Sequence, residues 1–444
     1  MRLIGGNISD TPVKEIADGS AFNVGGAAGA PALITLDSFS AAATATGWDS
    51  LEPNTSGESW GGTGYGTVKQ QHMKDDQDVY VWRSSVDNKV KAAVVDYHAT
   101  TGVATYGAEN DLSDFTTSAH GPVWIDRISA TSAMIMSCVN TDPQKFEWRQ
   151  YDISSGSLAG AAAKQTWTLT ATTYPYNHHA AGIHVVNADN CIVKANDYYF
   201  SSNGNMRYVG AKFTASQSQN STVDLGATYG PVCGGHSFAW GNGTDLYWVT
   251  NVGKIVVATV ASSPPVITGV SVKDAGTHYS GGYSFTVGDL GSNLILPATQ
   301  TETSEHFFLG WGRGLSYYAG VTEDADPFSA GSFGANSDNV PMVSSTGTGA
   351  HVDVRAKYID KIDNTHRFIF IQALASKIRA KAFNFDTVSK RISFGPSLDT
   401  TNITKHATGM LFGVSYPKAG ATSLNIIVQD DASAVKGLNL SFTP

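Results

Sequence analysis

The sequence predicts an all-β chain folded as a β-propeller of about seven blades with an irregular N-terminal arm. Three observations favour this fold class. Short apolar runs alternate with turn-forming residues, a group of strands recurs with a period near 55 residues, and long helices are hard to place anywhere. Of 444 residues, 46 are glycine, 41% are hydrophobic and 15% are charged, which provides a core and many tight turns.

The repeat is clearest in its first two copies. An apolar strand over 79–83 is followed by a polar turn and a second strand that ends near Asp96, before a turn at Gly102; Asp152 and Gly156 occupy the same places in the second copy. The recurring strand starts at Val79, Ala133, Cys191, Leu246, His306, Arg367 and Gly409, with spacings of 54, 58, 55, 60, 61 and 42 residues. Such small sheets must stack on one another to bury both faces, as blades do. A row of β-sandwich domains is the alternative, but one sandwich needs roughly 100 residues.

The domain organisation follows from a change in composition. Residues 1–72 are rich in Gly, Ala and Ser, and only 32–36 has the pattern of a strand. We expect an N-terminal arm there, either ordered against a partner or packed as loop on the main body. Residues 73–444 are expected to form the propeller, with an irregular inserted segment near 262–305. The alternating residues 438–442 are expected to close the ring, alongside 32–36.

Charge and sequence pattern exclude several classes of partner. The net charge of -9 leaves no basic stripe for nucleic acid, and no apolar stretch reaches the roughly 18 residues that a membrane span needs. The N-terminus lacks the pattern of a signal peptide, so we expect synthesis in the cytoplasm. The cysteines have neither disulfide nor zinc spacing and are expected to be small buried hydrophobes: Cys138, Cys191 and Cys233.

Histidines give the first candidate chemistry. His178, His179 and His184 lie close together, with Asp189 and Cys191 after them, and imidazoles in such a group can bind a metal. The spacing matches no familiar metal site, so we expect turn residues, no metal and no cofactor. A second set of histidines precedes the predicted strand starts: His120, His179, His236, His351 and His406. A ring of imidazoles would be pH-sensitive, but we expect these residues in hydrogen-bonded turns.

Catalytic motifs do not emerge from the sequence. A glycosidase needs an acid and a nucleophile or base about 5 to 9.5 Å apart, but the doublets Asp75-Asp76 and Asp430-Asp431 lie in polar turns. Sialidase boxes, nucleophile elbows, Walker loops and His-Glu-x-x-His are all missing. We therefore expect no enzyme and assign no catalytic residue. Four tryptophans lie in predicted strands and are expected in the core: Trp82, Trp148, Trp248 and Trp311. The aromatic residues of 174–177 could instead stack on sugar rings.

One stretch resembles a structural motif of bacteriophages. Val270 and Val272 form a Val-x-Val strand, Gly276 and Tyr279 a Gly-x-x-Tyr turn, and 347–350 a Gly-Thr-Gly-Ala turn. The spacing departs from the usual Gly-x-Gly-Tyr, and a candidate blade splits the motif. The resemblance implies a non-enzymatic virion structural protein of propeller type, in a tail, fibre or baseplate.

A virion protein of this kind would be a homo-oligomer in contact with other virion proteins, with a host-surface glycan as a further partner. No binding residue can be named for these contacts. Two alternatives remain, namely a polysaccharide-degrading propeller enzyme and an intracellular propeller scaffold that binds peptides.

Overall fold

The structure is a computed structural model of the whole chain. It describes residues 31–49, 68–98, 101–118, 123–139, 145–154, 156–168, 182–196, 205–213, 220–224, 240–241, 245–249, 254–261, 265–274, 294–302, 305–311, 317–323, 333–336, 353–374, 377–386, 391–400, 403, 411–415, 420–430 and 434–444. Within these ranges all regular elements are β-strands. No helix in the described part is long and apolar enough to cross a membrane.

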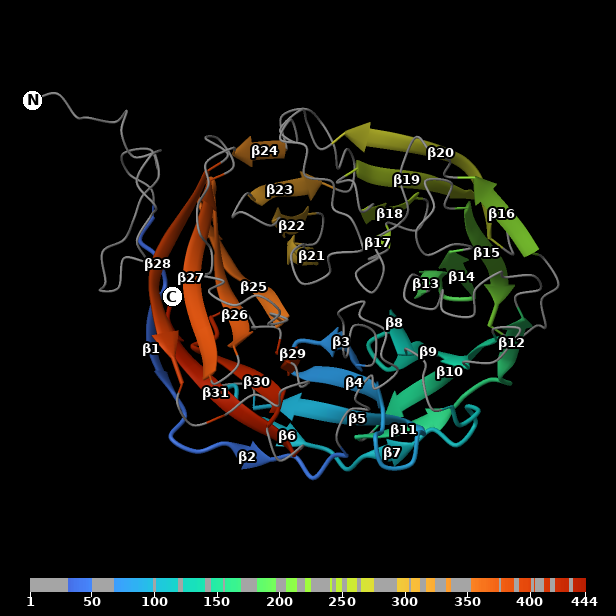
Figure 1. The fold of residues 1–444 in the computed structure, drawn as a ribbon, viewed down its shortest axis with the longest axis horizontal. Coiled ribbons are helices and arrows are strands. Elements are labelled where there is room, and N and C mark those ends of the chain that lie inside the picture. The colour runs from blue at the N-terminus through green and yellow to red at the C-terminus, as the bar shows by residue number, and fades with distance from the viewer. Residues whose placement is uncertain are drawn as a thin grey trace, which may run out of the picture.

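In the described part of the chain, seven antiparallel sheets follow one another around a ring, so the chain forms a β-propeller with seven described blades (Figure 1). In each sheet one edge strand lies nearest the centre of the ring, and the other strands lie progressively farther outward (Figure 1). The fold class predicted from the period and the turn composition is confirmed.

Among the described residues, the first three blades contain fourteen strands between them. Blade 1 contains β3 (Val68–Lys74), β4 (Gln77–Arg83), β5 (Val90–Tyr97), β6 (Ala104–Tyr106) and β7 (Asn110–Asp111). Blade 2 contains β8 (Val123–Ser129), β9 (Ser132–Val139), β10 (Lys145–Ser154), β11 (Ser157–Gly160) and β12 (Gln165–Thr168). Blade 3 contains β13 (Gly182–Asn187), β14 (Asn190–Asn196), β15 (Asn205–Lys212) and β16 (Asn220–Asp224).

The next three blades have four strands each. Blade 4 contains β17 (Trp240–Gly241), β18 (Asp245–Val249), β19 (Lys254–Ala261) and β20 (Val266–Asp274). Blade 5 contains β21 (Leu294–Glu302), β22 (Glu305–Trp311), β23 (Tyr317–Glu323) and β24 (Phe333–Asn336). Blade 6 contains β25 (Asp353–Ile362), β26 (Thr365–Leu374), β27 (Lys377–Asp386) and β28 (Arg391–Asp399).

Blade 7 combines strands from both ends of the described chain. It contains β29 (Leu411–Val414), β30 (Ser423–Gln429), β31 (Val435–Thr443), β1 (Thr35–Phe39) and β2 (Thr44–Ala45). β1 pairs antiparallel with β31 from Thr35 opposite Thr443 to Phe39 opposite Leu440, and β2 pairs with β31 farther along. The prediction that the last strand pairs with an early one is confirmed, although the early strand is 35–39 and not 32–36.

The recurring strand found in the sequence is the second strand of a blade in six of the seven cases, because these starts lie in β4, β9, β14, β18, β22 and β26. Among them, β4 and β9 are mainly apolar because neighbouring blades cover both of their faces, and every residue of these two strands is buried. In blade 7 the second strand is β30, not the segment at Gly409. Leu424 in β30 stands 57 residues after Arg367, which restores the period.

Two predicted boundaries look different in the structure. Residues 31–49, within the expected arm, run along blade 7, because this blade takes its outer strands from the N-terminal side. The expected boundary near residue 73 falls inside β3, which begins at Val68. Of the expected inserted segment 262–305, β20 is the outer strand of blade 4 and β21 the inner strand of blade 5. Gly102 and Gly156 have positive φ, in agreement with their equivalent turns.

The core is divided between adjacent blades. Blades 1 and 2 share a cluster around Val81, Val94 and Ile135, and blades 2 and 3 share another around Trp148, Cys191 and Val209. Further clusters lie between blades 6 and 7 and between blades 7 and 1. These described blades are therefore stabilised by their neighbours, and the ring needs a secure junction where it closes.

Residues 31–49, called the strap from here on, contact three successive blades. At the first end, the carbonyl oxygens of Pro31 and Ala32 accept hydrogen bonds from Asn384 Nδ2 (2.9 Å) and Arg367 Nη1 (3.2 Å) of blade 6. The middle of the strap pairs with β31 of blade 7. At the other end Trp48 stacks on Trp82 of blade 1, with ring centroids 5.2 Å apart.

Candidate functional site

The predicted histidine cluster is only partly within the described residues. His178 and His179 lie outside them, as do His120, His236, His351 and His406. His184 lies on β13, and its Nδ1 is 3.2 Å from Asp126 Oδ2 on β8. Among the described residues no group of three or more His, Cys, Asp or Glu could hold a metal ion.

Two cysteines of the described chain are buried. Cys138 and Cys191 are free and both belong to the core between blades 2 and 3. Burial, and secondarily the charge of Asp126, raises the pKa of the Cys191 thiol well above its ordinary value. A thiol must lose its proton to bind a metal or act as a nucleophile, and the raised pKa keeps Cys191 protonated. Cys191 therefore has the properties of a core residue, as the sequence predicted. Cys233 lies outside the described residues.

Asp126 connects blade 2 to blade 3. Besides His184, its Oδ2 accepts a hydrogen bond from the backbone N–H of Val185 at 2.6 Å. The carboxylate on the inner strand of one blade thus binds both a side chain and the backbone of the next. This arrangement fixes the two inner strands relative to each other.

A second histidine–aspartate pair lies where blade 7 meets blade 1. His72 Nδ1 on β3 is 2.9 Å from Oδ1 of Asp78, which is fully buried on β4. Asp78 Oδ2 accepts hydrogen bonds from Gln70 Nε2 (2.7 Å) and Tyr97 Oη (2.8 Å). Burial and then the nearby Asp78 raise the pKa of Tyr97 well above its ordinary value, so its hydroxyl remains a donor. Gln70 Nε2 also donates to the carbonyl of Val414 in blade 7 at 2.7 Å.

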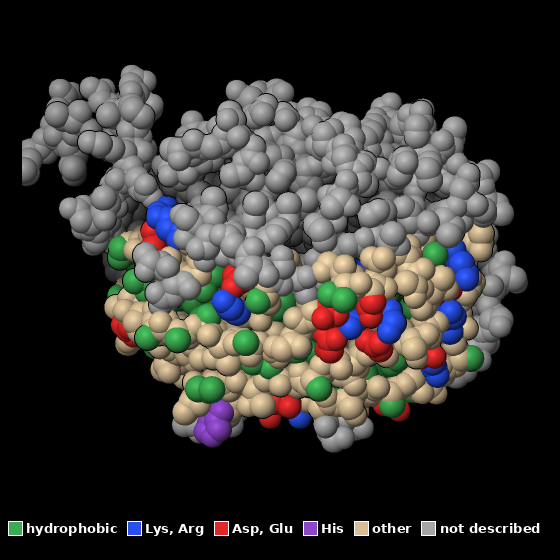
Figure 2. All heavy atoms as spheres, turned by 60° about the horizontal axis from the view of Figure 1, so that its bottom comes forward, with side chains coloured by type: hydrophobic (Ala, Val, Ile, Leu, Met, Phe, Trp, Pro, Cys, Tyr) green, Lys and Arg blue, Asp and Glu red, His purple; other side chains and the backbone are tan. Residues whose placement is uncertain are grey.

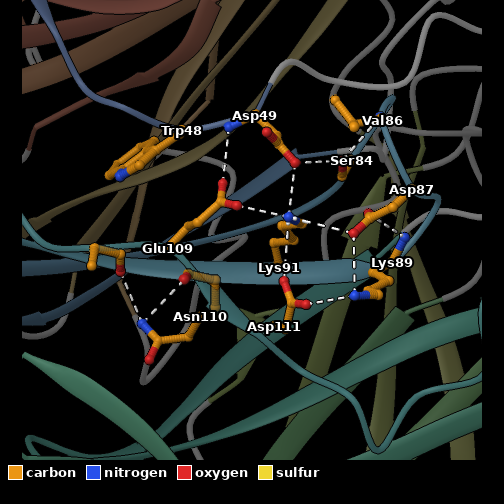
Figure 3. A network of polar contacts seen from close by, with 12 residues as sticks. Trp48, Asp49, Ser84, Val86, Asp87, Lys89, Lys91, Glu109, Asn110 and Asp111 are labelled. Atoms are coloured by element: carbon orange, nitrogen blue, oxygen red, sulfur yellow. Dashed lines mark hydrogen bonds and ion pairs between the residues drawn. The ribbon is translucent and has the colours of Figure 1, made fainter.

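A larger network of charged side chains lies on blade 1, and Figure 3 shows it around Lys91. Lys91 Nζ is 2.7 Å from Asp49 Oδ2, 2.7 Å from Glu109 Oε1 and 3.2 Å from Asp111 Oδ1. Asp87 lies 3.6 Å away. Lys89 Nζ lies 2.7 Å from Asp111 and 3.3 Å from Asp87. These six residues, the Lys91 cluster, combine four carboxylates with two ammonium groups.

Strand pairing and a tight turn position the Lys91 cluster. Lys91 on β5 lies directly opposite Asp111 on β7. The turn between β4 and β5 has Asn88 in the left-handed conformation, with φ of 59°, and brings Asp87 and Lys89 beside them. Asp49 comes from the strap. Its backbone N–H donates to Glu109 Oε2 at 2.9 Å, and its Oδ2 accepts from Ser84 Oγ at 2.9 Å.

The electrostatics favour the charged forms of Lys91, Asp87 and Asp111. Burial opposes the charge of Lys91, but hydrogen bonds to Asp49, Glu109 and Asp111 outweigh it and raise its pKa well above the ordinary value. Partial burial also opposes the charge of Asp87, yet the Lys89 backbone N–H and the charge of Lys91 lower its pKa. The hydrogen bond from Lys89 is the main cause of the lowered pKa of Asp111. Such carboxylates stabilise the fold above their ordinary pKa, and the stabilisation is lost as the pH falls.

Glu147 is a further buried carboxylate, on β10 of blade 2. It lies 2.7 Å from Lys145 Nζ and 3.2 Å from Lys164 Nζ. It also accepts hydrogen bonds from Thr116, 2.7 Å from the backbone N and 2.8 Å from Oγ1. Burial would raise the pKa of Glu147, but Lys145 and then Thr116 outweigh it and lower the pKa. The carboxylate therefore fixes the segment that leaves blade 1 onto blade 2.

Comparison with known proteins adds only general similarities. No family model matches the chain. No curated protein matches it either.

Solved structures resemble it at low identity. A Saccharomyces cerevisiae core factor structure is 11% identical with a TM-score of 0.46, covering 93% of this chain and 62% of that one. The chain thus spans less than two thirds of that protein. The WD40 domain of Toxoplasma gondii coronin is 8% identical, with a TM-score of 0.44 and coverage of 93% and 88%. The lectin BP39L from Burkholderia pseudomallei is 12% identical, with a TM-score of 0.44 and coverage of 85% and 96%.

The remaining predicted positions have structural surroundings where the structure describes them. Asp76 lies in the turn between β3 and β4, 3.5 Å from Lys74 Nζ, while Asp430 is paired with Lys436 and accepts the N–H of Ala434 at 2.9 Å. Trp82 and Trp148 are fully buried, as expected. Trp248 and Trp311 lie in β18 and β22. Asp431 and residues 174–177 lie outside the described part of the chain.

Sequence reasoning did not find the Lys91 cluster. Its members carry no motif, and Asp49 lies 42 positions before Lys91 in a stretch assigned to the arm. A usable signal is the adjacent Trp48, an aromatic residue in a Gly- and Ser-rich stretch. On the face shown in Figure 2, acidic and basic side chains of the described residues are intermixed, and no stripe of one sign is visible.

Proposed function

We propose that the protein is a non-enzymatic structural platform of a bacteriophage virion, attached to other virion proteins, with exposed loops available to a host-surface glycan. The observation that carries the platform role is the way the ring is tied together. The strap contacts blades 6, 7 and 1, and Asp126 and Glu147 connect their blades to the next segment. A ring tied in this way supports rigid presentation of its loops.

The virion assignment is supported by the sequence motif. Val270 and Val272 of that motif lie in β20, the outer strand of blade 4. Gly276, Tyr279 and residues 347–350 lie outside the described part of the chain. An outer strand is a reasonable place for contact with a neighbouring subunit.

Carboxylate chemistry favours the platform over the polysaccharide-degrading enzyme. A glycosidase acid needs a raised pKa, so that it is protonated near neutral pH. Glu147 and Asp111 instead have lowered pKa values, because lysines contact them. Asp78 accepts hydrogen bonds from two neutral side chains beside His72. These carboxylates have the partners of structural groups.

Fractionation of phage particles tests the proposal. Antibody raised against the purified chain is used to probe density-gradient fractions of a phage-induced culture of the source organism. We expect the protein in the particle fraction of induced cells. Its presence only in the soluble fraction, or in cells that carry no phage genes, would contradict the virion role. Release of oligosaccharides from host-surface polysaccharide by the purified chain would support the enzyme instead.

A further inference from the structure

We propose that the strap is a reversible latch: acid releases residues 31–49 from blades 7 and 1, with the Lys91 cluster as the lock, while the blades stay folded. The inference does not depend on the virion role. It concerns an opening of the ring at one defined seam.

The strap is less firmly packed than the strands it covers. β1 has only exposed and half-buried residues, and its register is irregular between Leu36 and Ser38. β2 has two exposed residues. The strap's main apolar anchors are Ile34 and Trp48, both buried, at opposite ends. By contrast, β4 and β9 are buried along their whole length. Segments with few buried contacts open at a lower free energy than the core of a domain.

The lock acts on the end of the strap that follows β2. Lys91 Nζ contacts the carboxylate of Asp49 and also Glu109, whose second oxygen accepts the backbone N–H of Asp49. Both the side chain and the backbone of Asp49 are thereby bound to blade 1. Trp48, next to it, lies against Trp82 and donates from Nε1 to the carbonyl of Gly107 at 2.9 Å. Release of Asp49 frees the strap to lift Trp48 out of this site.

The charged groups at this lock come from the strap and from three segments of blade 1. The strap contributes Asp49, the turn between β4 and β5 contributes Asp87 and Lys89, β5 contributes Lys91, and the segment through β7 contributes Glu109 and Asp111. Protonation of the carboxylates leaves the two lysines without counter-charges. The ammonium groups of Lys89 and Lys91 then repel each other, and Asp49 loses its attraction to Lys91.

Two further carboxylates lie along the strap. Asp37 Oδ2 accepts a hydrogen bond from Thr443 Oγ1 at 2.9 Å. Asp360 pairs with Arg367, which donates to the carbonyl of Ala32. These contacts hold the middle and the first end of the strap.

Strap release would uncover the edge of β31 and the side chain of Val435. Val435 is buried in the cluster that contains Trp48, and its carbonyl accepts hydrogen bonds from the N–H (3.0 Å) and Oγ1 (2.9 Å) of Thr46. A cysteine at this position is therefore a probe of strap release. Ile135, buried in the core between blades 1 and 2, provides the matched probe of blade opening.

The experiment measures thiol labelling of Val435→Cys and Ile135→Cys in the full-length chain. Dithiodipyridine is the reagent because it reacts with thiols in acid, and the parent chain gives the background from its own cysteines. We expect labelling of Val435→Cys to rise at least about tenfold between neutral pH and about pH 3, below the ordinary pKa of carboxyl groups, because the pKa values of Asp87 and Asp111 are lowered. Labelling of Ile135→Cys should stay at background.

Lysine variants identify the lock. Lys91→Met should raise the labelling of Val435→Cys at neutral pH, since it leaves the partly exposed carboxylates of Asp49 and Glu109 without their cation. Lys89→Met is the matched control, because Lys89 contacts Asp87 and Asp111 but is not paired with the strap residue Asp49; it should change labelling little. Simultaneous exposure of both probes, or a Val435→Cys probe that stays protected in acid and in Lys91→Met, would overturn the latch.

Discussion

Replacement of Trp48 by alanine should strongly destabilise the propeller, although this residue lies in a stretch with the composition of a flexible arm. Its ring stacks on Trp82 at 5.2 Å and meets Tyr106 edge-on at 5.8 Å. It is 6% exposed, between blades 7 and 1. Truncation of a buried tryptophan to alanine costs about 3–5 kcal/mol, because contacts are lost and a cavity remains. About 1 kcal/mol of this belongs to the hydrogen bond to Gly107.

The assay is urea unfolding followed by circular dichroism, with Trp48→Phe as the matched variant. Phenylalanine keeps an aromatic ring at the seam but lacks the Nε1 donor, so its cost should be well below that of alanine. A loss below about 0.5 kcal/mol for Trp48→Ala, the range of ordinary surface substitutions, would show that the strap is not part of the cooperative fold.

Three other substitutions or truncations test the closure and the ties between blades. Removal of residues 437–444 takes away most of β31 and leaves an open sheet edge, so the chain should aggregate, as light scattering would show; a soluble chain with an unchanged Tm would refute the closure. Gly437→Ala should lower stability by about 1–3 kcal/mol, since its Cβ would lie 1.6 Å from Tyr106 Oη, and Tyr106→Ala in the same chain should restore part of the loss in thermal unfolding. Glu147→Gln should lower Tm at neutral pH and flatten its decline in acid, because the lowered pKa of Glu147 stabilises the fold above its ordinary value; an unchanged pH profile would contradict the assignment.

The sequence was sufficient for the fold because the repeat is strong where blades are most buried. Strands such as β4 and β9 must be apolar on both faces, so their spacing records the number of blades. The exception is blade 7. Its second strand is preceded by residues 411–414, which have a similar apolar pattern, and the period alone could not distinguish the two.

The strap and its contacts could not be predicted in the same way. β1 is a strand of only five residues, from Thr35 to Phe39, and edge strands need little apolar character because one side faces solvent. Composition therefore suggested an arm. The partners of Asp49 and Asp126 lie in other blades, so local spacing contains no information about them.

Closure by the strap also affects how the chain reaches its native state during synthesis. Asp37 and Thr443 are hydrogen-bonded although they lie 406 positions apart. A ribosome therefore makes β1 long before its partner strand β31 exists. Blades 1 to 6 can form their local hairpins as they emerge, since those pairings join neighbours in sequence, whereas the seventh must wait until β31 has been made. During that interval β1 is an unpaired strand at risk of mispairing, and its exposed, polar surface is well suited to keep it soluble until β31 arrives.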